Sequence, residues 1–242
     1  MRLQRYQRRR SSSSGCVFVI IVLLVLLVIT VLLLLPALTS LTLQIAGFTR
    51  KGHTNALFTN ATPLPVILPQ NGRQISQVTL DLGRYGRHVL NRDTSDMVMI
   101  VDDADVSVAT MQLSEDGLTH ICLQISDICA GSDDRYQNMT IDLRPGGVIV
   151  AADVRVLTGA IRQRVGVVLR LDEEARQLVV EGVDVDGILY DVPPNNIGDL
   201  VQDAERIGNE ILRTVTIAVS SRAYILSQVF IDENALWLVL HS

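Results

Sequence analysis

Residues 16–35, CVFVIIVLLVLLVITVLLLL, form an apolar run that only Thr30 interrupts, and none of its residues is charged. At about 1.5 Å per residue, a helix of this length spans roughly 30 Å, the thickness of a bilayer's hydrocarbon core. A helix packed on a soluble core would carry a polar face, and this run has none. Because the residue before a proline disfavours the α region, Pro36 marks the end of the helix. The sequence therefore predicts one transmembrane helix over residues 16–36.

The segment before this run, residues 1–15, carries positive charges only, on Arg2, Arg5, Arg8, Arg9 and Arg10. Such a basic tail stays in the cytoplasm, so we expect a single-pass protein of the cell membrane with an extracytoplasmic C-terminal domain. The rival interpretation is a cleaved signal peptide, whose apolar core would be about 7–15 residues long. The run here is longer, and PALTSLTLQIAG after it offers only a poor cleavage site. We therefore predict an anchor in contact with the lipid bilayer.

The remainder of the chain is acidic and aliphatic. Five of the 21 basic residues and none of the 26 acidic ones precede residue 36, so residues 36–242 carry a net charge of −10. That charge argues against nucleic acid as a partner, because phosphate binding needs clustered Lys and Arg. Aromatic residues are few, while Val, Leu and Ile are abundant, which suits a β-rich fold.

Two of the three cysteines, Cys122 and Cys129, lie in this part of the chain; the third is Cys16. Cys122 and Cys129 either pair in an oxidising compartment or remain buried free thiols, and we favour free thiols. On one continuous helix their Cα atoms would be about 10 Å apart, beyond the range of a disulfide. A bridge between them therefore requires the helix to end before Cys129.

Residues 37–74 are rich in Pro, Asn and Gly, and we interpret them as a juxtamembrane linker with one short strand near 65–68. The extracytoplasmic domain then covers residues 75–242. Apolar residues alternate over 78–82, 97–101 and 106–111, which predicts three strands. Ser114 is a good N-cap for a short amphipathic helix, whose apolar positions are Leu118, Ile121, Cys122 and Ile125.

Residues 138–186 predict an antiparallel meander of four long strands. In the fourth strand the alternation changes phase at Gly182, where a β-bulge would restore the register. After Pro193 and Pro194 the period becomes helical through about Arg213, so this helix should pack on the meander. The chain closes with a hairpin of strands 223–231 and 235–241, which are apolar on both faces. Such strands need cover on both sides, which either a central position or an acyl-chain cavity would supply.

Three segments resemble motifs of small membrane-anchored bacterial envelope proteins related to the tubular lipid-binding (TULIP, BPI-like) superfamily. QLSEDGLTHICLQI resembles their helix start, NMTIDLRPGGVIVAADV their strand turn, and VDVDGILYDVPPNNIGDLVQDAERIGNEI their proline loop and following helix. The resemblance implies an α+β fold in which a curved antiparallel sheet wraps on one long amphipathic helix plus a shorter one. It also implies that apolar lipid lies between the sheet and the long helix, with no catalytic residues.

The sequence shows no G-x-S-x-G, H-E-x-x-H, phosphate-binding glycine loop or C-x-x-C motif, and its four histidines are far apart. We therefore expect neither an enzyme nor a cofactor or metal site. The expected function is extracytoplasmic binding or transfer of an acyl-chain ligand near the membrane. The alternative is a non-catalytic structural or assembly protein of the cell envelope, with an unknown protein partner. The residues expected to contact lipid are Leu118, Ile121, Ile125, Ile197, Leu200, Val201, Ala204, Ile207, Ile211, Leu226, Phe230 and Leu238.

Overall fold

The computed structural model describes residues 48–59, 71–95, 97–125, 130, 136–156, 161–192 and 198–242. All of these except Phe48 belong to one unit, Thr49–Ser242. The predicted basic tail, the predicted transmembrane helix and the strand expected near 65–68 lie outside the described residues. Within the described ranges, no helix is both long enough and apolar enough to cross a membrane.

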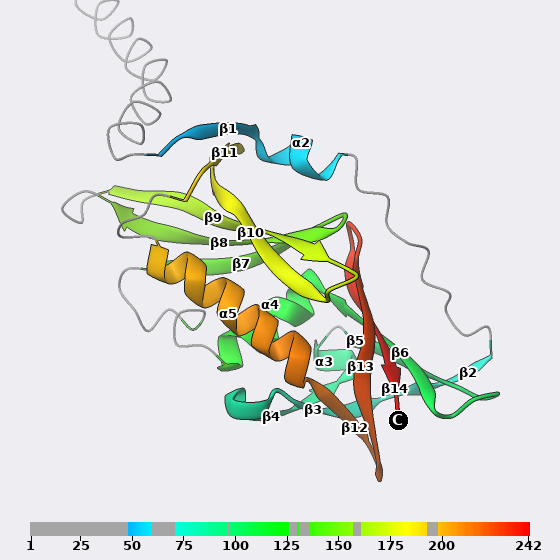
Figure 1. Cartoon of the computed structure of the whole chain (residues 1–242). Coiled ribbons are helices and arrows are strands. Elements are labelled where there is room, and N and C mark those ends of the chain that lie inside the picture. Colours follow the sequence, from blue (N-terminus) through cyan, green and yellow to red (C-terminus); the bar gives the residue numbers. More distant parts are fainter. Residues whose placement is uncertain are drawn as a thin grey trace, which may run out of the picture. The chain divides into compact units, whose positions relative to one another are not determined.

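The unit is mostly β, with two antiparallel sheets, one of which is curled into a half-barrel, and a few short helices (Figure 1). The first sheet has six strands. Their order is β1 (Arg50–His53), β11 (Ile188–Tyr190), β10 (Gln177–Val185), β9 (Ile161–Asp172), β8 (Gly147–Val156) and β7 (Tyr136–Arg144). Strands β7 to β10 pair in sequence order, which confirms the predicted meander.

The predicted bulge at Gly182 is also confirmed, because the pairing of β10 with β9 shifts register between Val180 and Gly182. Strand β11 passes close to this bulge. A Cβ atom on Gly182 would lie 2.2 Å from the backbone oxygen of Tyr190, so only glycine fits at this position.

The second sheet has eight strands. Their order is β2 (Gly72–Ile75), β5 (Met97–Asp102), β6 (Val108–Ser114), β14 (Ala235–His241), β13 (Arg222–Ile231), β12 (Thr216–Val219), β3 (Gln77–Asp81) and β4 (Arg87–Asn91). The predicted terminal hairpin, β13–β14, lies at the centre of this sheet, between β12 and β6. Its two apolar faces are not equally covered, because Tyr224 and Leu226 are buried while Ile225 between them is exposed. Asp232 forms its turn by accepting hydrogen bonds from the backbone N–H groups of Asn234 and Ala235.

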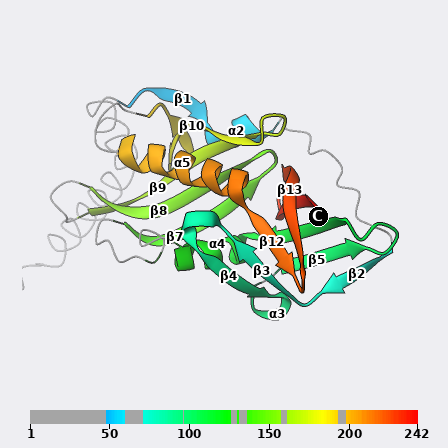
Figure 2. The same ribbon diagram turned by 60° about the horizontal axis from the view of Figure 1, so that its bottom comes forward.

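Two longer helices pack on the first sheet. Helix α4 (Glu115–Ile125) begins after Ser114, whose Oγ accepts the N–H of Gly117 at 3.1 Å, as the predicted cap requires. Helix α5 (Gly198–Thr214) matches the predicted long helix. Figures 1 and 2 show α5 running along β8 to β10, with β3 and β4 of the second sheet near its C-terminal end. The shorter helices are α2 (Thr54–Phe58), α3 (Arg92–Ser95) and the 3-10 turn η1 (Gly83–Tyr85).

The structure differs from the expected single curved sheet because the described strands divide between two sheets. Strands β3, β5 and β6 belong to the sheet that contains the C-terminal hairpin, so they do not extend the meander. The range 37–74, interpreted as a linker, contributes β1, α2 and the first residues of β2. Strand β1 has the sequence RKGH, which carries no apolar alternation and is held by its pairing with β11. Short strands held by distant partners leave no local pattern in a sequence.

Candidate functional site: an apolar cavity between the helices

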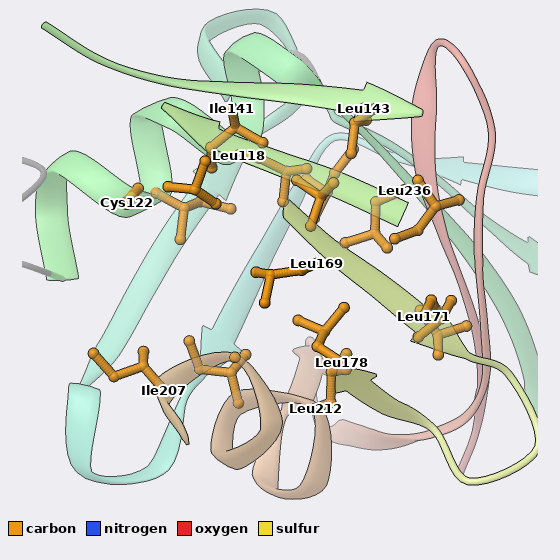
Figure 3. A pocket seen from close by; sticks show the side chains of 18 of the residues that line it. Leu118, Cys122, Ile141, Leu143, Leu169, Leu171, Leu178, Ile207, Leu212 and Leu236 are labelled. Atoms are coloured by element: carbon orange, nitrogen blue, oxygen red, sulfur yellow. The ribbon is translucent and has the colours of Figure 1, made fainter. Parts of the chain in front are cut away.

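An apolar cavity of about 260 Å³ lies between the two sheets and the helices α4 and α5. Its walls come from β3, β6, the four meander strands, both helices, the hairpin and Val215 after α5. The described residues that line it are aliphatic, apart from Cys122, Met139 and Gly208. Figure 3 shows Leu118 and Ile141 on one side of the space and Ile207, Leu178 and Leu212 on the other. The described residues of these walls present no acid, base or free thiol, because Cys122 is disulfide-bonded, so they interact with a ligand by removing apolar surface from water.

Helix α4 is fixed to the edge of the first sheet by side chains that accept backbone hydrogen bonds. Strand β7 is an edge strand, so one row of its N–H groups has no strand partner. Thr119 Oγ1 accepts the N–H of Ile141 at 3.3 Å, and Glu115 Oε1 accepts the N–H of Leu143 at 2.7 Å. These two contacts give two N–H groups of the strand edge a partner and hold α4 where its Leu118 and Ile121 line the cavity.

Helix α5 is fixed to β10 in the same way. The N–H of Leu178 donates to Asn209 Oδ1 at 2.6 Å, and Asn209 Nδ2 donates to the carbonyl oxygen of Leu178 at 2.9 Å. Asn209 therefore replaces a strand partner for Leu178. The adjacent Gly208 allows a close approach, because a Cβ atom there would lie 2.7 Å from Leu178 Cδ1.

A hairpin of the second sheet contacts both helices. In the loop between β3 and β4, Arg84 forms an ion pair with Glu210 of α5. On β4, His88 Nδ1 lies 3.2 Å from Gln124 Oε1 of α4. Polar contacts therefore hold each helix at its edges, and the apolar faces of the helices lie across the cavity from each other. This arrangement explains why the space is not closed by direct packing of one helix on the other.

The lining of the cavity is unevenly exposed. Leu80, Leu113 and Leu169 on the sheets are buried. The lining residues of α5 and Leu118 of α4 are only partly buried, and so are Ile141 of β7 and Val150 of β8. An entering molecule would therefore reach the cavity past this partly buried part of the lining.

The predicted lipid contacts divide into three groups. Six line the cavity: Leu118, Ile121, Ala204, Ile207, Ile211 and Leu238. Val201 and Leu226 are buried and Phe230 is partly buried, but none of these three belongs to the lining. The side chains of Ile125, Ile197 and Leu200 lie outside the described set.

Phe230 misses the cavity because β13 contains a bulge. The pairing with β14 shifts register between Leu226 and Gln228, so Val229 and Ile231 take the cavity face. Sequence reasoning also omitted the strand residues of the wall, including Leu143, Leu169 and Leu178. Their alternation along the meander was the available signal for an inward face.

Cys122, which lines the cavity, is disulfide-bonded. The interpretation as a free thiol is therefore wrong for this residue. The two other cysteines, Cys16 and Cys129, lie outside the described residues.

A polar cluster at the far end of the meander stabilises the start of β7. Asn138 Nδ2 donates to Asp153 Oδ2 at 2.6 Å, and Arg164 Nη1 donates to Asp153 Oδ1 at 3.3 Å. The hydrogen bond from Asn138, followed by the interaction with Arg164, lowers the pKa of Asp153 below its ordinary value. The described residues include no group of three or more His, Cys, Asp or Glu side chains placed to hold a metal ion.

No protein-family model matches this chain, and no curated protein or solved structure matches it.

Proposed function

We propose that this chain is a membrane-anchored, extracytoplasmic lipid-binding protein that holds or transfers an acyl chain near the bilayer. The observation that carries the proposal is the cavity of about 260 Å³ with apolar walls. A protein interior is normally filled by its own side chains, so an apolar space of this size costs stability while it is empty, and a bound ligand would offset that cost. An acyl chain matches the chemistry of the walls.

Two further observations support the cellular setting. The disulfide at Cys122 favours an oxidising compartment outside the cytoplasm. The apolar run 16–35 and the basic residues before it favour an anchor that leaves residues 49–242 on that outer side. Within the proposal, α5 and the meander correspond to the long helix and curved sheet of TULIP-like proteins.

The proposed location can be tested on intact cells. Protease added outside the cells should remove the folded unit, while a cytoplasmic location would protect it.

The binding test uses the full chain, purified from membranes in a steroid-based detergent, which has no alkyl chain to occupy the cavity. Native mass spectrometry should find co-purified lipid, and the delipidated chain should take up a fluorescent fatty acid. Ala204→Trp fills the cavity and should abolish uptake. Gln202→Trp adds the same ring on an exposed part of α5 and should leave uptake unchanged.

Circular dichroism and thermal unfolding must first show that both variants are folded. If the wild type takes up no lipid, or if the two variants behave alike, the cavity is not a lipid site. A single dominant protein crosslink in the intact envelope would then favour the structural or assembly role.

A further inference from the structure

We propose that the cavity accepts one alkyl chain to a depth of about ten carbons and leaves the headgroup outside. This inference rests on the proposed function and specifies its ligand. It also assigns Ala204 and Leu212, two turns apart along one face of α5, as the residues that set the accepted length.

The cavity volume limits the ligand to one chain. An engineered apolar cavity of about 150 Å³ holds benzene, which has six carbons, so a space of this size holds about ten carbons in the same proportion. Sites for drug-sized molecules occupy about 300–1,000 Å³, more than is found here. Two acyl chains of a phospholipid therefore do not fit together.

The chemistry of the walls places the headgroup outside. None of the described lining residues carries a charge. The polar side chains next to the lining, Glu115, Thr119 and Asn209, already accept or donate hydrogen bonds to β7 and β10. A carboxylate or phosphate drawn inside would lose water and gain no partner, which is costly. The headgroup therefore stays at the partly buried part of the lining, which includes the α5 residues and Leu118.

Ala204 and Leu212 lie two turns apart on the lining face of α5, and the small side chain of Ala204 leaves space there. Replacing Ala204 by Leu adds three carbons to the wall, and replacing Leu212 by Ala removes three. The first change should shorten the accepted chain by about three carbons and the second should lengthen it by about three.

The test offers the full chain, in steroid-based detergent, an equimolar mixture of saturated straight-chain acids of about six to about sixteen carbons, which brackets the inferred length. Native mass spectrometry identifies the acids that bind and their number per chain. We expect one acid per chain and a maximum near ten carbons. The maximum should move to shorter acids in Ala204→Leu and to longer acids in Leu212→Ala. Leu123→Ala, at an exposed position of α4, is the matched control and should leave the distribution unchanged.

Comparison of variants in the same micelles removes the effect of partitioning into detergent. Straight-chain alcohols are offered in a second arm. Their binding should be strongest at the same chain length, because the cavity walls make no contact that distinguishes a hydroxyl from a carboxylate headgroup. A phosphatidylcholine with two saturated chains is the third arm. If it binds, its binding should respond to Ala204→Leu, which would identify a membrane lipid as the source of the chain.

Two bound chains, or a length distribution that none of the variants changes, would overturn the inference while leaving lipid binding intact. A maximum that depends on the headgroup would also overturn it. If no acid, alcohol or phospholipid binds to the wild type, the proposed function itself fails. The two failures are therefore distinguishable in one experiment.

Discussion

Filling the cavity should stabilise the ligand-free protein while it weakens ligand binding. The change is Ala204→Leu, which adds three carbons on the lining face of α5. Each buried carbon group contributes about 0.8 kcal/mol, or about 2.4 kcal/mol for three. Ordering the leucine side chain costs about 0.5–1 kcal/mol. The net gain in the free energy of unfolding is therefore about 1.5–2 kcal/mol, an upper estimate that assumes no strain.

This gain should appear as a higher melting temperature. For a domain of 150–250 residues, 1 kcal/mol corresponds to about 2–4 °C, so we expect an increase of about 3–8 °C. The assay is thermal unfolding of the full chain, followed by circular dichroism after native mass spectrometry has shown that no lipid remains. Added decanoic acid should raise the melting temperature of the wild type and have a smaller effect on the variant.

The sign of the change in melting temperature on Ala204→Leu distinguishes an empty cavity from an interior that is already filled by side chains. In a filled core, the same substitution would overpack and destabilise the protein by about 1–3 kcal/mol. Ala109→Leu provides that comparison, because Ala109 is fully buried between Val101 and Leu240 and does not line the cavity. We expect Ala109→Leu to lower the melting temperature. If Ala204→Leu lowers the melting temperature as much as Ala109→Leu does, the space between the helices is already filled by side chains and the proposed cavity does not exist.

Three further predictions concern the contacts that hold the unit together. Asn209→Ala leaves the N–H and C=O of Leu178 without their partner, so it should lower the free energy of unfolding by about 1–3 kcal/mol and increase amide exchange along α5. Gly182→Ala forces a Cβ atom against β11 and should destabilise the protein by more than about 2 kcal/mol in a denaturant titration. The pKa of Asp153 is lower in the folded than in the unfolded protein, so its contribution is present above the unfolded pKa and is lost as the pH falls through the folded pKa. Thermal unfolding between neutral and acidic pH should therefore show a loss, below about 1 kcal/mol, that Asp153→Asn lacks.

The long elements of this unit were predictable from the sequence, whereas short ones such as β1 and α2 were not. The 3.6-residue period around Ile207 and Ile211 identified α5 and its cavity face, and the alternation over 138–186 identified the meander. Both patterns arise because one side of a helix or strand is buried, and the residues on that side are apolar and recur at a regular spacing in the sequence. Gly182 was informative for the same reason, since the phase of the alternation changes there.

The pairing of distant strands was not predictable in this way. Whether β14 pairs with β6, or β3 with β12, depends on residues more than a hundred positions apart. The bulge in β13 reversed the faces of its second half, which moved Phe230 away from the cavity and Val229 into it. Asn209, Thr119 and Glu115 are ordinary polar residues on helices, and only the adjacent strand edges show that they fix those helices in place.

The most direct test of the account is a set of nuclear Overhauser effects between a bound alkyl chain and the methyl groups of the cavity. Decanoic acid labelled with carbon-13 is added to the full chain, whose Ile and Leu methyl groups carry their own label. The account predicts contacts from the chain to Ile207, Ile211 and Leu238, which lie on both sides of the cavity. Contacts only to exposed methyl groups, such as those of Ile225 and Leu123, would contradict it.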